Sequence, residues 1–335
     1  MNRQRFFFDM NDIKDFLQKI ERIFEEEQFV HQPEELYAPI DYTLRLGGKR
    51  IRPTLLMVAN AMFGGDESQV RDAAIGIETF HNFTLLHDDL MDRSPLRRGQ
   101  PTVYRKWNEN TAILSGDTMF ALAWRYFLRQ PSPRLREVLD CFNETAIEVC
   151  EGQQYDMNFE KRNLVGIDEY MLMIRKKTAV LLAGALKIGA LYAGAPAADI
   201  ERLYQFGIHM GLSFQLQDDL LDAYGDVAVF GKQTGQDIRD NKKTFLPLRA
   251  LELANEAQKA ELLSLFGAAG VECGEEEKVR RVLAVYDQVD VRRDVEKIIA
   301  QEDSAAIGFL EEIALPADRK KPLYEMMEML KGRKK

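Results

Sequence analysis

The distribution of proline is the feature that most constrains how this chain can fold. Proline is absent from residues 134–195, 197–246 and 248–315. Leu, Ala, Met, Glu and Lys dominate these stretches, and all five residue types favour helices. The alternating apolar and polar pattern of strands is nearly missing. The sequence therefore predicts an all-α protein built from long helices.

The first third of the chain is punctuated by glycine and proline, and apolar residues recur at helical spacing between them. This pattern predicts helices joined by short loops. No Gly/Ser-rich linker or low-complexity segment divides the sequence. We therefore expect one α-helical domain over residues 1–335.

Composition and charge exclude several classes of protein. Apolar residues make up 46% and charged residues 30%, a balance typical of globular proteins. The net charge of −9 argues against nucleic-acid binding, which needs clustered Lys and Arg. Three cysteines without a C-x-x-C pair fit a reducing compartment. Because no signal peptide or transmembrane segment is recognisable either, we expect a cytoplasmic protein.

Two aspartate-rich segments carry the strongest chemical signal. Residues 80–92 read FHNFTLLHDDLMD and residues 211–222 read GLSFQLQDDLLD, so each ends in a D-D-x-x-D motif. On a helix the first and last aspartates of such a motif share one face, about 6 Å apart, and repel each other. Oxygen ligands without His or Cys suit Mg²⁺ bound together with substrate phosphates. One such motif is more often a solvated surface, but two copies with apolar approaches favour a metal site.

Basic residues supply the second part of a phosphate site. The segment GGKRIRP (47–53) places three cations directly after a flexible glycine pair. Glycines let the backbone approach an anion, while Lys and Arg supply a point charge and a bidentate fork. Arg97 and Arg98 follow the first motif after a loop, so their guanidinium groups can fold back over a metal that the aspartates hold.

These segments together resemble the signatures of the trans-isoprenyl diphosphate synthases. The resemblance rests on residues 47–53, on LLHDDLMDRSPLRRG (85–99) and on 211–222, and it continues in the family's order through Lys177-Thr178, Phe230-Gly231-Lys232 and Lys242-Lys243-Thr244. It implies an all-α bundle around a deep apolar cavity, usually in a homodimer. It also implies Mg²⁺-dependent head-to-tail (1'-4) condensation of isopentenyl diphosphate with an allylic diphosphate.

The resemblance assigns roles to individual residues. The Mg²⁺ ions, three when substrate is bound, would be held by Asp88, Asp92, Asp218 and Asp222, with Asp89 and Asp219 supporting. The allylic diphosphate would be gripped by Arg97, Lys177, Lys232 and Lys242. The isopentenyl diphosphate site would contain Lys49, Arg52, His81 and Arg98. Beside the catalytic Lys177, Thr178 and Gln215 would aim oxygen lone pairs at the allylic cation, and the released diphosphate would accept the proton.

Aromatic residues before the first motif bear on product length. In the family, the fifth residue before the first aspartate, here Phe83, helps to form the cavity floor that stops chain growth. Thr84 is small and Phe80 could set a lower floor, so the position of the floor stays open. We expect farnesyl or geranylgeranyl diphosphate as the product. The first motif lacks the two extra residues that many bacterial farnesyl synthases carry, which favours geranylgeranyl diphosphate.

Both histidines of this helix have a structural alternative. His81 lies seven residues before Asp88, two helical turns along the same stripe, so it either reaches substrate or satisfies a hydrogen bond in the core. His87 points about 100° away from Asp88, which indicates a structural role. Phe214 is expected in the core. The basic end KGRKK either closes over the site or lies in solvent, as charged termini usually do.

Three other functions fit the sequence less well. A terpene cyclase typically mixes Asn, Ser or Thr with acids in its second motif, and it needs no second diphosphate site. A catalytically silent partner subunit would be favoured by the loss of an aspartate motif, but both motifs are intact. A two-metal phosphohydrolase or nuclease also uses carboxylates, but the apolar approaches and the acidic net charge argue against it.

Overall fold

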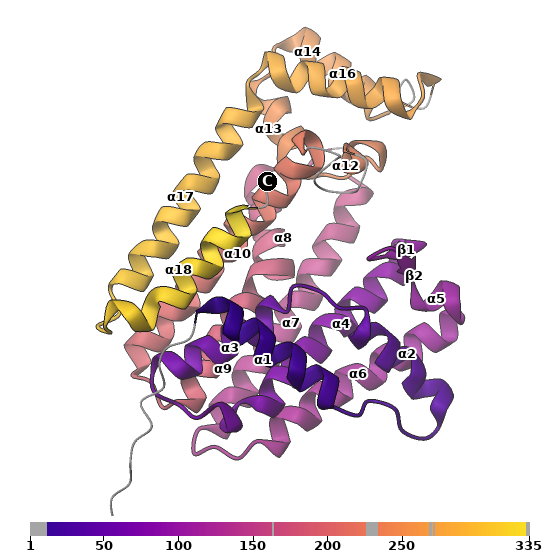
Figure 1. Cartoon of the computed structure of the whole chain (residues 1–335). Helices are drawn as coiled ribbons and strands as arrows, with labels where there is room; N and C mark the ends of the chain where they lie inside the picture. Colours follow the sequence, from indigo (N-terminus) through magenta and orange to yellow (C-terminus); the bar gives the residue numbers. More distant parts are fainter. Residues whose placement is uncertain (1–11, 163, 226–233, 268–269, 271, 333–335) are drawn as a thin grey trace, which may run out of the picture. The chain divides into compact units, whose positions relative to one another are not determined.

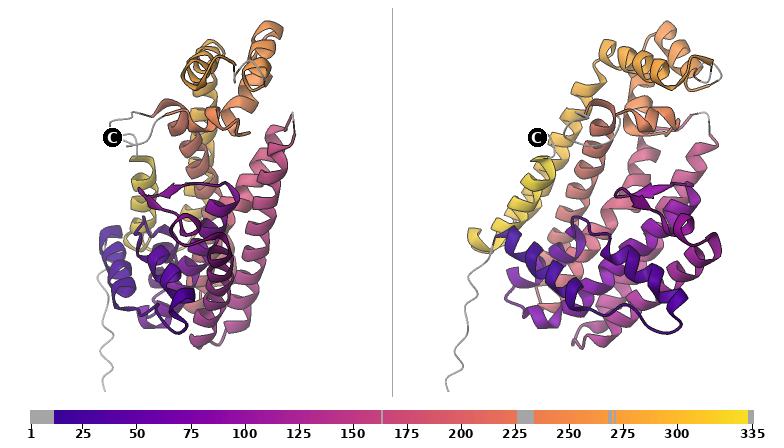
Figure 2. Two further views of the ribbon diagram at one scale, coloured as in Figure 1. Left: turned by 90° about the vertical axis from the view of Figure 1, so that its right-hand side faces the viewer. Right: turned by 45° about the vertical axis from the view of Figure 1, so that its right-hand side comes forward.

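The computed structural model describes residues 12–162, 164–225, 234–267, 270 and 272–332. Nearly all of these residues lie in helices, which confirms the predicted all-α fold (Figure 1). Within the described residues the only strands are β1 (Leu96–Arg97) and β2 (Gln100–Pro101), which pair antiparallel, and they are the only arrows in both views of Figure 2.

By its internal contacts the chain divides into two compact units, and we describe each by itself. Unit 1 comprises Met1–Asn143, Gly184–Glu201 and Ala314–Met326, and unit 2 comprises Glu144–Ala183, Arg202–Ile313 and Met327–Lys335. Four helices, α7, α9, α10 and α18, contribute residues to both units. The expectation of a single domain over residues 1–335 stays a prediction.

The first half of the chain forms short and medium helices that alternate with tight turns. Its elements are α1 (Ile13–Glu26), α2 (Glu34–Arg45), α3 (Ile51–Met62), η1 (Glu67–Gln69), α4 (Arg71–Met91), α5 (Val103–Lys106) and α6 (Glu109–Arg129). Asp12 caps α1 by accepting the backbone N–H groups of Lys14 and Asp15. Nearly every residue of α3 is buried, as expected for a helix that is apolar on all sides.

Helix α4 is the element of unit 1 that matters most for the site. It packs along α6 and against α3, and its buried positions include Ile77, Phe80 and Leu86. Gly76 permits this approach, because a Cβ there would lie only 3.1 Å from the carbonyl oxygen of Ala123 on α6. The close packing fixes the helix that carries the first aspartate motif.

The rest of the chain contains helices of 4 to 28 residues. They are α7 (Leu135–Glu160), α8 (Ile167–Ile174), the π-helical turn η2 (Arg175–Ala179), α9 (Val180–Tyr192), α10 (Ala197–Tyr224), α12 (Gln236–Arg239), α13 (Phe245–Leu253), α14 (Glu256–Leu265), α16 (Glu275–Gln288), α17 (Val291–Glu311) and α18 (Ala317–Lys331). The three longest of them, α7, α10 and α17, lie within the proline-free stretches of the sequence.

Candidate active site

The first aspartate motif lies at the C-terminal end of α4. Asp88 and Asp89 are in the last turn, and Asp92 is the C-cap residue, whose N–H donates to the carbonyl oxygen of Asp88 (2.8 Å). The helix macrodipole places partial negative charge at this end. Helix and carboxylates therefore combine to attract a cation.

Arg97 folds back from the β1–β2 turn onto this motif, as the sequence predicts. Its Nε donates to both carboxylate oxygens of Asp89, at 2.9 and 2.8 Å, and its Nη2 lies 2.7 Å from Asp89 Oδ1 and 3.9 Å from Asp88 Oδ2. Burial raises the pKa of Asp89, while Arg97 opposes that rise. Asp89 therefore holds the arginine in place, and the side chain of Asp88 is more exposed (22%) than that of Asp89 (6%).

The GGKRIRP turn lies in the same unit and contacts the second arginine of the β1–β2 turn. Gly48 has φ +136°, a conformation that side chains disfavour, and a Cβ there would lie 2.6 Å from Arg98 Nη2. The glycine thus lets the Arg98 guanidinium pack directly on the backbone beside the exposed Lys49. Two predicted members of the isopentenyl diphosphate site are therefore neighbours.

Arg50, the middle cation of this turn, is buried and points inward. It adopts φ 46° in the left-handed region, and its side chain is 2% exposed. Its Nη1 lies 3.1 Å from Glu78 Oε1, its Nη2 donates to the carbonyl oxygen of Leu44 (2.7 Å), and its guanidinium lies 4.2 Å from the Phe24 ring centroid. Arg50 thus anchors the turn to α4.

Arg52 and His81 form the third contact of this cluster. Arg52 Nη1 lies 3.0 Å from His81 Nε2, and because a guanidinium can only donate, His81 Nε2 accepts and the proton sits on Nδ1. Burial, then the charges of Arg52 and Arg98, lower the pKa of His81 well below 6.5. His81 is therefore a neutral imidazole that supports a dense group of cations.

The second aspartate motif lies near the C-terminal end of α10, so the negative end of a macrodipole again adds to the carboxylates. Asp219 is buried: Tyr170 O–H and the Phe245 N–H donate to its Oδ2, and Gln215 Nε2 donates to its Oδ1 (3.1 Å). Burial raises the pKa of Asp219 to about 7 against these hydrogen bonds. The supporting role of Asp219 stays a prediction.

Asp222 holds the short helix α12 by its N-terminus. Its two carboxylate oxygens accept the backbone N–H groups of Gln236 (3.2 Å) and Asp237 (3.0 Å). This contact brings Asp237 beside Asp222 and Asp219 around a small pocket that Lys242 also lines. Burial, then repulsion from Asp222 and Asp219, raises the pKa of Asp237 to about 8. No sequence motif marks Asp237, although it stands only five residues before Lys242.

The predicted catalytic residues of unit 2 converge on the π-helical turn η2. Lys177 Nζ bonds Asp156 Oδ2 on α7 (2.7 Å), and Thr178 Oγ1 donates to Gln215 Oε1 on α10 (3.1 Å). Lys242 bonds Glu160 at the end of α7 (3.2 Å). Lys232, the remaining predicted cation, lies outside the described residues.

Phe83 and Phe80 belong to an aromatic cluster on α4 and α6. Phe80 is fully buried and Phe83 half-buried, and their ring centroids lie 5.9 and 5.4 Å from that of Phe120. Thr84 donates to the carbonyl oxygen of His81 (2.8 Å). His87 Nε2 lies 3.2 Å from the carbonyl oxygen of Ile113 on α6, consistent with a structural role. Phe120 is a further candidate for the floor of the product cavity, and no sequence motif marks it.

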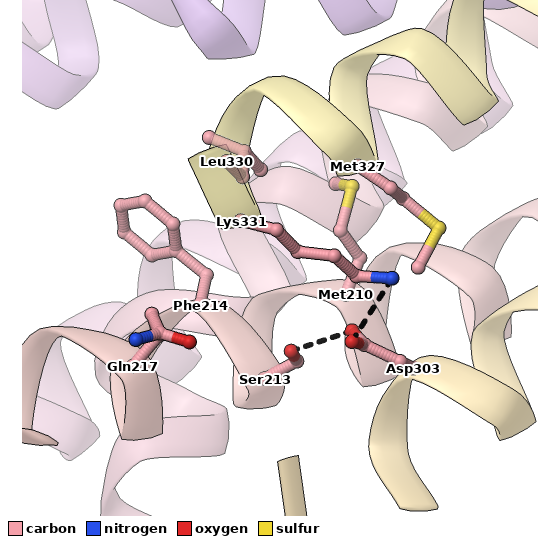
Figure 3. A pocket seen from close by; sticks show the side chains of 8 residues that line it. All are labelled: Met210, Ser213, Phe214, Gln217, Asp303, Met327, Leu330 and Lys331. Atoms are coloured by element: carbon pink, nitrogen blue, oxygen red, sulfur yellow. Dashed lines mark hydrogen bonds and ion pairs between the residues drawn. The ribbon is translucent and has the colours of Figure 1, made fainter. Parts of the chain in front are cut away.

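The opposite face of α10 lines a separate small pocket, shown in Figure 3. Asp303 on α17 accepts a hydrogen bond from Ser213 (2.6 Å) and pairs with Lys331 (3.1 Å). Phe214, expected in the core, is half-buried and lines this pocket. The first residue of the basic end KGRKK is therefore tied to α17, while residues 333–335 lie outside the described residues.

The donor set suits Mg²⁺ that is held jointly with phosphates. All candidate ligands are carboxylate oxygens, and in the described part of the chain no three His, Cys, Asp or Glu side chains gather as a complete metal site. Mg²⁺ commonly takes one or two protein carboxylates and completes its shell with water and substrate phosphates. The residues present therefore fit this ion.

Comparisons with known proteins show the family of this chain. The family model described as polyprenyl synthetase matches residues 33–289. A geranylgeranyl diphosphate synthase of Methanosarcina mazei is 37% identical over 305 residues, which are 90% of this chain and 89% of that protein. A geranylfarnesyl diphosphate synthase of Natronomonas pharaonis is 42% identical over 239 residues, covering 66% of this chain and 70% of the relative.

Solved structures are similar over nearly the whole chain. A geranylgeranyl pyrophosphate synthase superposes with a TM-score of 0.91 at 40% identity, covering 97% of this chain and 100% of its own. A geranylgeranyl pyrophosphate synthetase from Pyrococcus horikoshii gives a TM-score of 0.86 at 32% identity, over 95% of this chain and 97% of its own.

Among the described residues, no helix is both long and apolar enough to cross a membrane.

Proposed function

This chain belongs to the polyprenyl synthetase family, and from that premise we propose that it joins isopentenyl diphosphate to allylic diphosphates by 1'-4 condensation. It is a prenyltransferase that forms short-chain prenyl diphosphates. The residue assignments are supported by the position of each D-D-x-x-D motif at the C-terminal end of a helix, with a cation of the same unit near it. Arg97 contacts the first motif, and Lys242 lines a pocket with Asp219 and Asp222 of the second.

Asp88, Asp92, Asp218 and Asp222 are the proposed ligands of Mg²⁺, with three ions in the substrate complex. When bound, these ions neutralise the charge that develops on the departing diphosphate. The oxygen-only donor set and the two negative helix ends support this proposal. Among the described residues, each carboxylate oxygen of Asp222 accepts one backbone N–H, and a carboxylate oxygen has a second lone pair that can bind a metal.

The two diphosphates use separate groups of cations in this proposal. Lys49, Arg52 and Arg98 bind isopentenyl diphosphate, with neutral His81 donating through Nδ1–H. Arg97, Lys177, Lys232 and Lys242 bind the allylic diphosphate. Asp89 and Asp156 orient two of these cations before substrate arrives. A cation held in position loses less conformational entropy when the phosphate binds.

Thr178 and Gln215 stabilise the allylic cation. The amide of Gln215 is fixed at both ends, since Nε2 donates to Asp219 and Oε1 accepts from Thr178. This orientation keeps the amide oxygen, rather than the N–H₂ group, beside the Thr178 hydroxyl oxygen. Both groups then present lone pairs, and such preorganised dipoles lower the barrier to forming a cation.

The reaction balances without a protein nucleophile. The allylic C–O bond breaks, and its electron pair leaves with the diphosphate. The double bond of isopentenyl diphosphate supplies the electrons of the new C–C bond, which leaves a tertiary cation on that substrate. A carbon next to this cation loses a proton to the released diphosphate, and the electrons of its C–H bond form the new double bond. The side chains of this protein therefore bind, orient and stabilise charge.

We propose geranylgeranyl diphosphate as the main product and farnesyl diphosphate as the alternative. Phe83 and Phe80 lie about one and two helical turns before Asp88 on α4, and Phe120 on α6 packs against both. These bulky side chains lie where a cavity floor would stop a growing chain. The names of several relatives, geranylgeranyl diphosphate synthases among them, support a short product.

A homodimer and a cytoplasmic location stay predictions of the sequence. Ile113, Leu114 and Leu128 on α6 are 46%, 59% and 57% exposed, and apolar side chains exposed in such number on one helix favour an interface.

The proposed activity is tested by incubating the purified protein with Mg²⁺, labelled isopentenyl diphosphate and dimethylallyl, geranyl or farnesyl diphosphate in turn. Chromatography of the products should show a ladder that ends at farnesyl or geranylgeranyl. A longer ladder would keep the reaction and refute the aromatic floor. If no starter is elongated, the proposed function is wrong.

A further inference from the structure

The π-helical turn η2 is an unusual backbone segment at a functional position. The N–H of Val180 donates to the carbonyl oxygen of Arg175, five residues earlier, instead of the four residues of an α-helix. Such a turn is equivalent to one extra residue in a helix, and it needs outside support to persist. Lys177 and Thr178 both lie within it.

One side of η2 is held by a glycine on α7. A Cβ at Gly152 would lie 2.3 Å from the backbone nitrogen and 2.6 Å from the Cα of Lys177. The atoms in the way belong to the backbone and not to a flexible side chain. Only glycine therefore allows α7 to approach the turn this closely.

A second glycine holds the other side from α10. A Cβ at Gly211 would lie 2.5 Å from the Cα and 2.6 Å from the Cβ of Ala179, the last residue of η2. Gly211 is buried, as is Gly152. The turn is thus contacted at the backbone level by two different helices.

Each glycine is followed four residues later by a polar side chain that bonds the turn. Asp156 follows Gly152 and binds Lys177 Nζ, and Gln215 follows Gly211 and accepts from Thr178. Residues four apart share one face of a helix. Both neighbouring helices therefore contact η2 through the same pattern: a glycine that allows close approach, and a polar residue one helical turn later.

We propose that Gly152 and Gly211 are positioning residues, and that the residue pairs Gly152/Asp156 and Gly211/Gln215 form a glycine clamp on η2. The clamp fixes the π-helical turn so that the Lys177 ammonium group and the Thr178 hydroxyl meet the allylic diphosphate in the correct place. This inference rests on the proposed function, because it takes the roles of Lys177 and Thr178 from it.

The test compares Gly152→Ala and Gly211→Ala with a matched control, Gly308→Ala. Gly308 is an exposed glycine within α17, and a Cβ there would meet no atom within 4 Å. The control should keep wild-type kinetics and gain thermal stability, since alanine favours a helix more than glycine does. For all proteins we would measure kcat, the KM for each substrate, the affinity for inorganic diphosphate with Mg²⁺, and the melting temperature.

The clamp variants should lose kcat by about 10- to 100-fold, because small misplacements of catalytic groups have effects of that order. Their affinity for Mg²⁺-diphosphate should fall with it, while the KM for isopentenyl diphosphate should stay within about twofold, because the residues proposed for that site lie in unit 1. A lower melting temperature with unchanged kcat and diphosphate affinity would show a merely structural role and overturn the proposal.

Deletion of Lys176 provides a second test that adds no atoms to the contact. Removing one residue should convert the π-helical turn to an α-helix and leave α8 and α9 in register. This variant should fold and lose kcat by about 100-fold, and wild-type kcat would overturn the proposal even if the alanine variants do not fold. If instead the wild-type protein binds Mg²⁺-diphosphate but elongates no starter, the proposed function fails, while the diphosphate affinities of the variants still test the clamp.

Discussion

The buried ion pair between Arg50 and Glu78 makes a strong prediction about stability. Both side chains are 2% exposed, and Glu78 Oε1 also accepts from Asn82 Nδ2 (3.3 Å). The substitution Glu78→Gln keeps the size of the side chain and removes its charge. Arg50 would then be buried beside a neutral amide, with only the half-exposed Glu21 as a charged partner (3.4 Å).

The magnitude follows from the cost of an uncompensated buried charge. Removing one partner of a buried pair typically costs about 3–5 kcal/mol. Arg50 keeps the Leu44 carbonyl and the Phe24 ring, so we expect the lower end, about 3 kcal/mol. With an unfolding entropy of about 2 cal/mol/K for each residue, this corresponds to a fall of about 4 °C in melting temperature for the whole chain.

The assay is thermal and denaturant unfolding of five proteins: the wild type, Glu78→Gln, Arg50→Met, the double variant Arg50→Met/Glu78→Gln and the control Glu21→Gln. The control removes an exposed charge near the same arginine and should cost at most about 1 kcal/mol. The double variant should recover part of the loss, because the unpaired charge is gone. The reasoning is refuted if Glu78→Gln loses less than about 1 kcal/mol, or if the double variant is no more stable than the sum of the single changes predicts.

Three further predictions concern the other parts of the structure. The pKa of His81 in the folded protein lies well below 6.5. As the pH falls below about 6.5, His81 therefore stays neutral in the folded protein but takes up a proton in the unfolded chain. The folded protein thus loses stability as the pH falls from about 6.5 towards the folded pKa. Chemical unfolding of His81→Gln should show a smaller loss between about pH 7 and pH 5 than the wild type, and parallel curves would contradict the assignment. Tyr170→Phe removes a buried hydrogen bond to Asp219 and should lower the free energy of unfolding by about 1–3 kcal/mol. The exposed control Tyr155→Phe should have a smaller effect, and equal effects would contradict the role of the Tyr170–Asp219 hydrogen bond. Leu114→Glu should convert a dimer to a monomer in light scattering, whereas Leu263→Glu on α14 should not, and a wild-type monomer would refute the interface on α6.

The helical fold and the local geometry around the first aspartate motif could be predicted because their signals are local. The proline-free stretches indicate the long helices, and the spacing of Asp88 and Asp92 indicates a shared helix face. The return of Arg97 to the first motif was predictable too, because only a short turn separates them. In these cases the relevant distance in sequence is a few residues.

Other features depend on contacts that the local sequence does not reveal. Arg50 has the same residue type as its neighbour Arg52, and only its left-handed backbone and the distant partner Glu78 turn it inward. The π-helical turn has no local signature, because Gly152 and Gly211, which stabilise it, lie on other helices. Asp237 lies beside Asp219 and Asp222 because its backbone N–H at the start of α12 donates to the Asp222 carboxylate.

The most direct test of the central claim is the Mg²⁺-dependent rate of prenyl transfer in Asp88→Asn and Asp218→Asn, with Asp168→Asn on the exposed start of α8 as the matched control. The account predicts that each motif variant folds and loses kcat by about 10²–10³-fold, as expected when one group that stabilises developing charge is removed, while the control keeps the wild-type rate. Wild-type rates in both motif variants would contradict the claim that the two aspartate motifs hold the metal ions that drive the reaction.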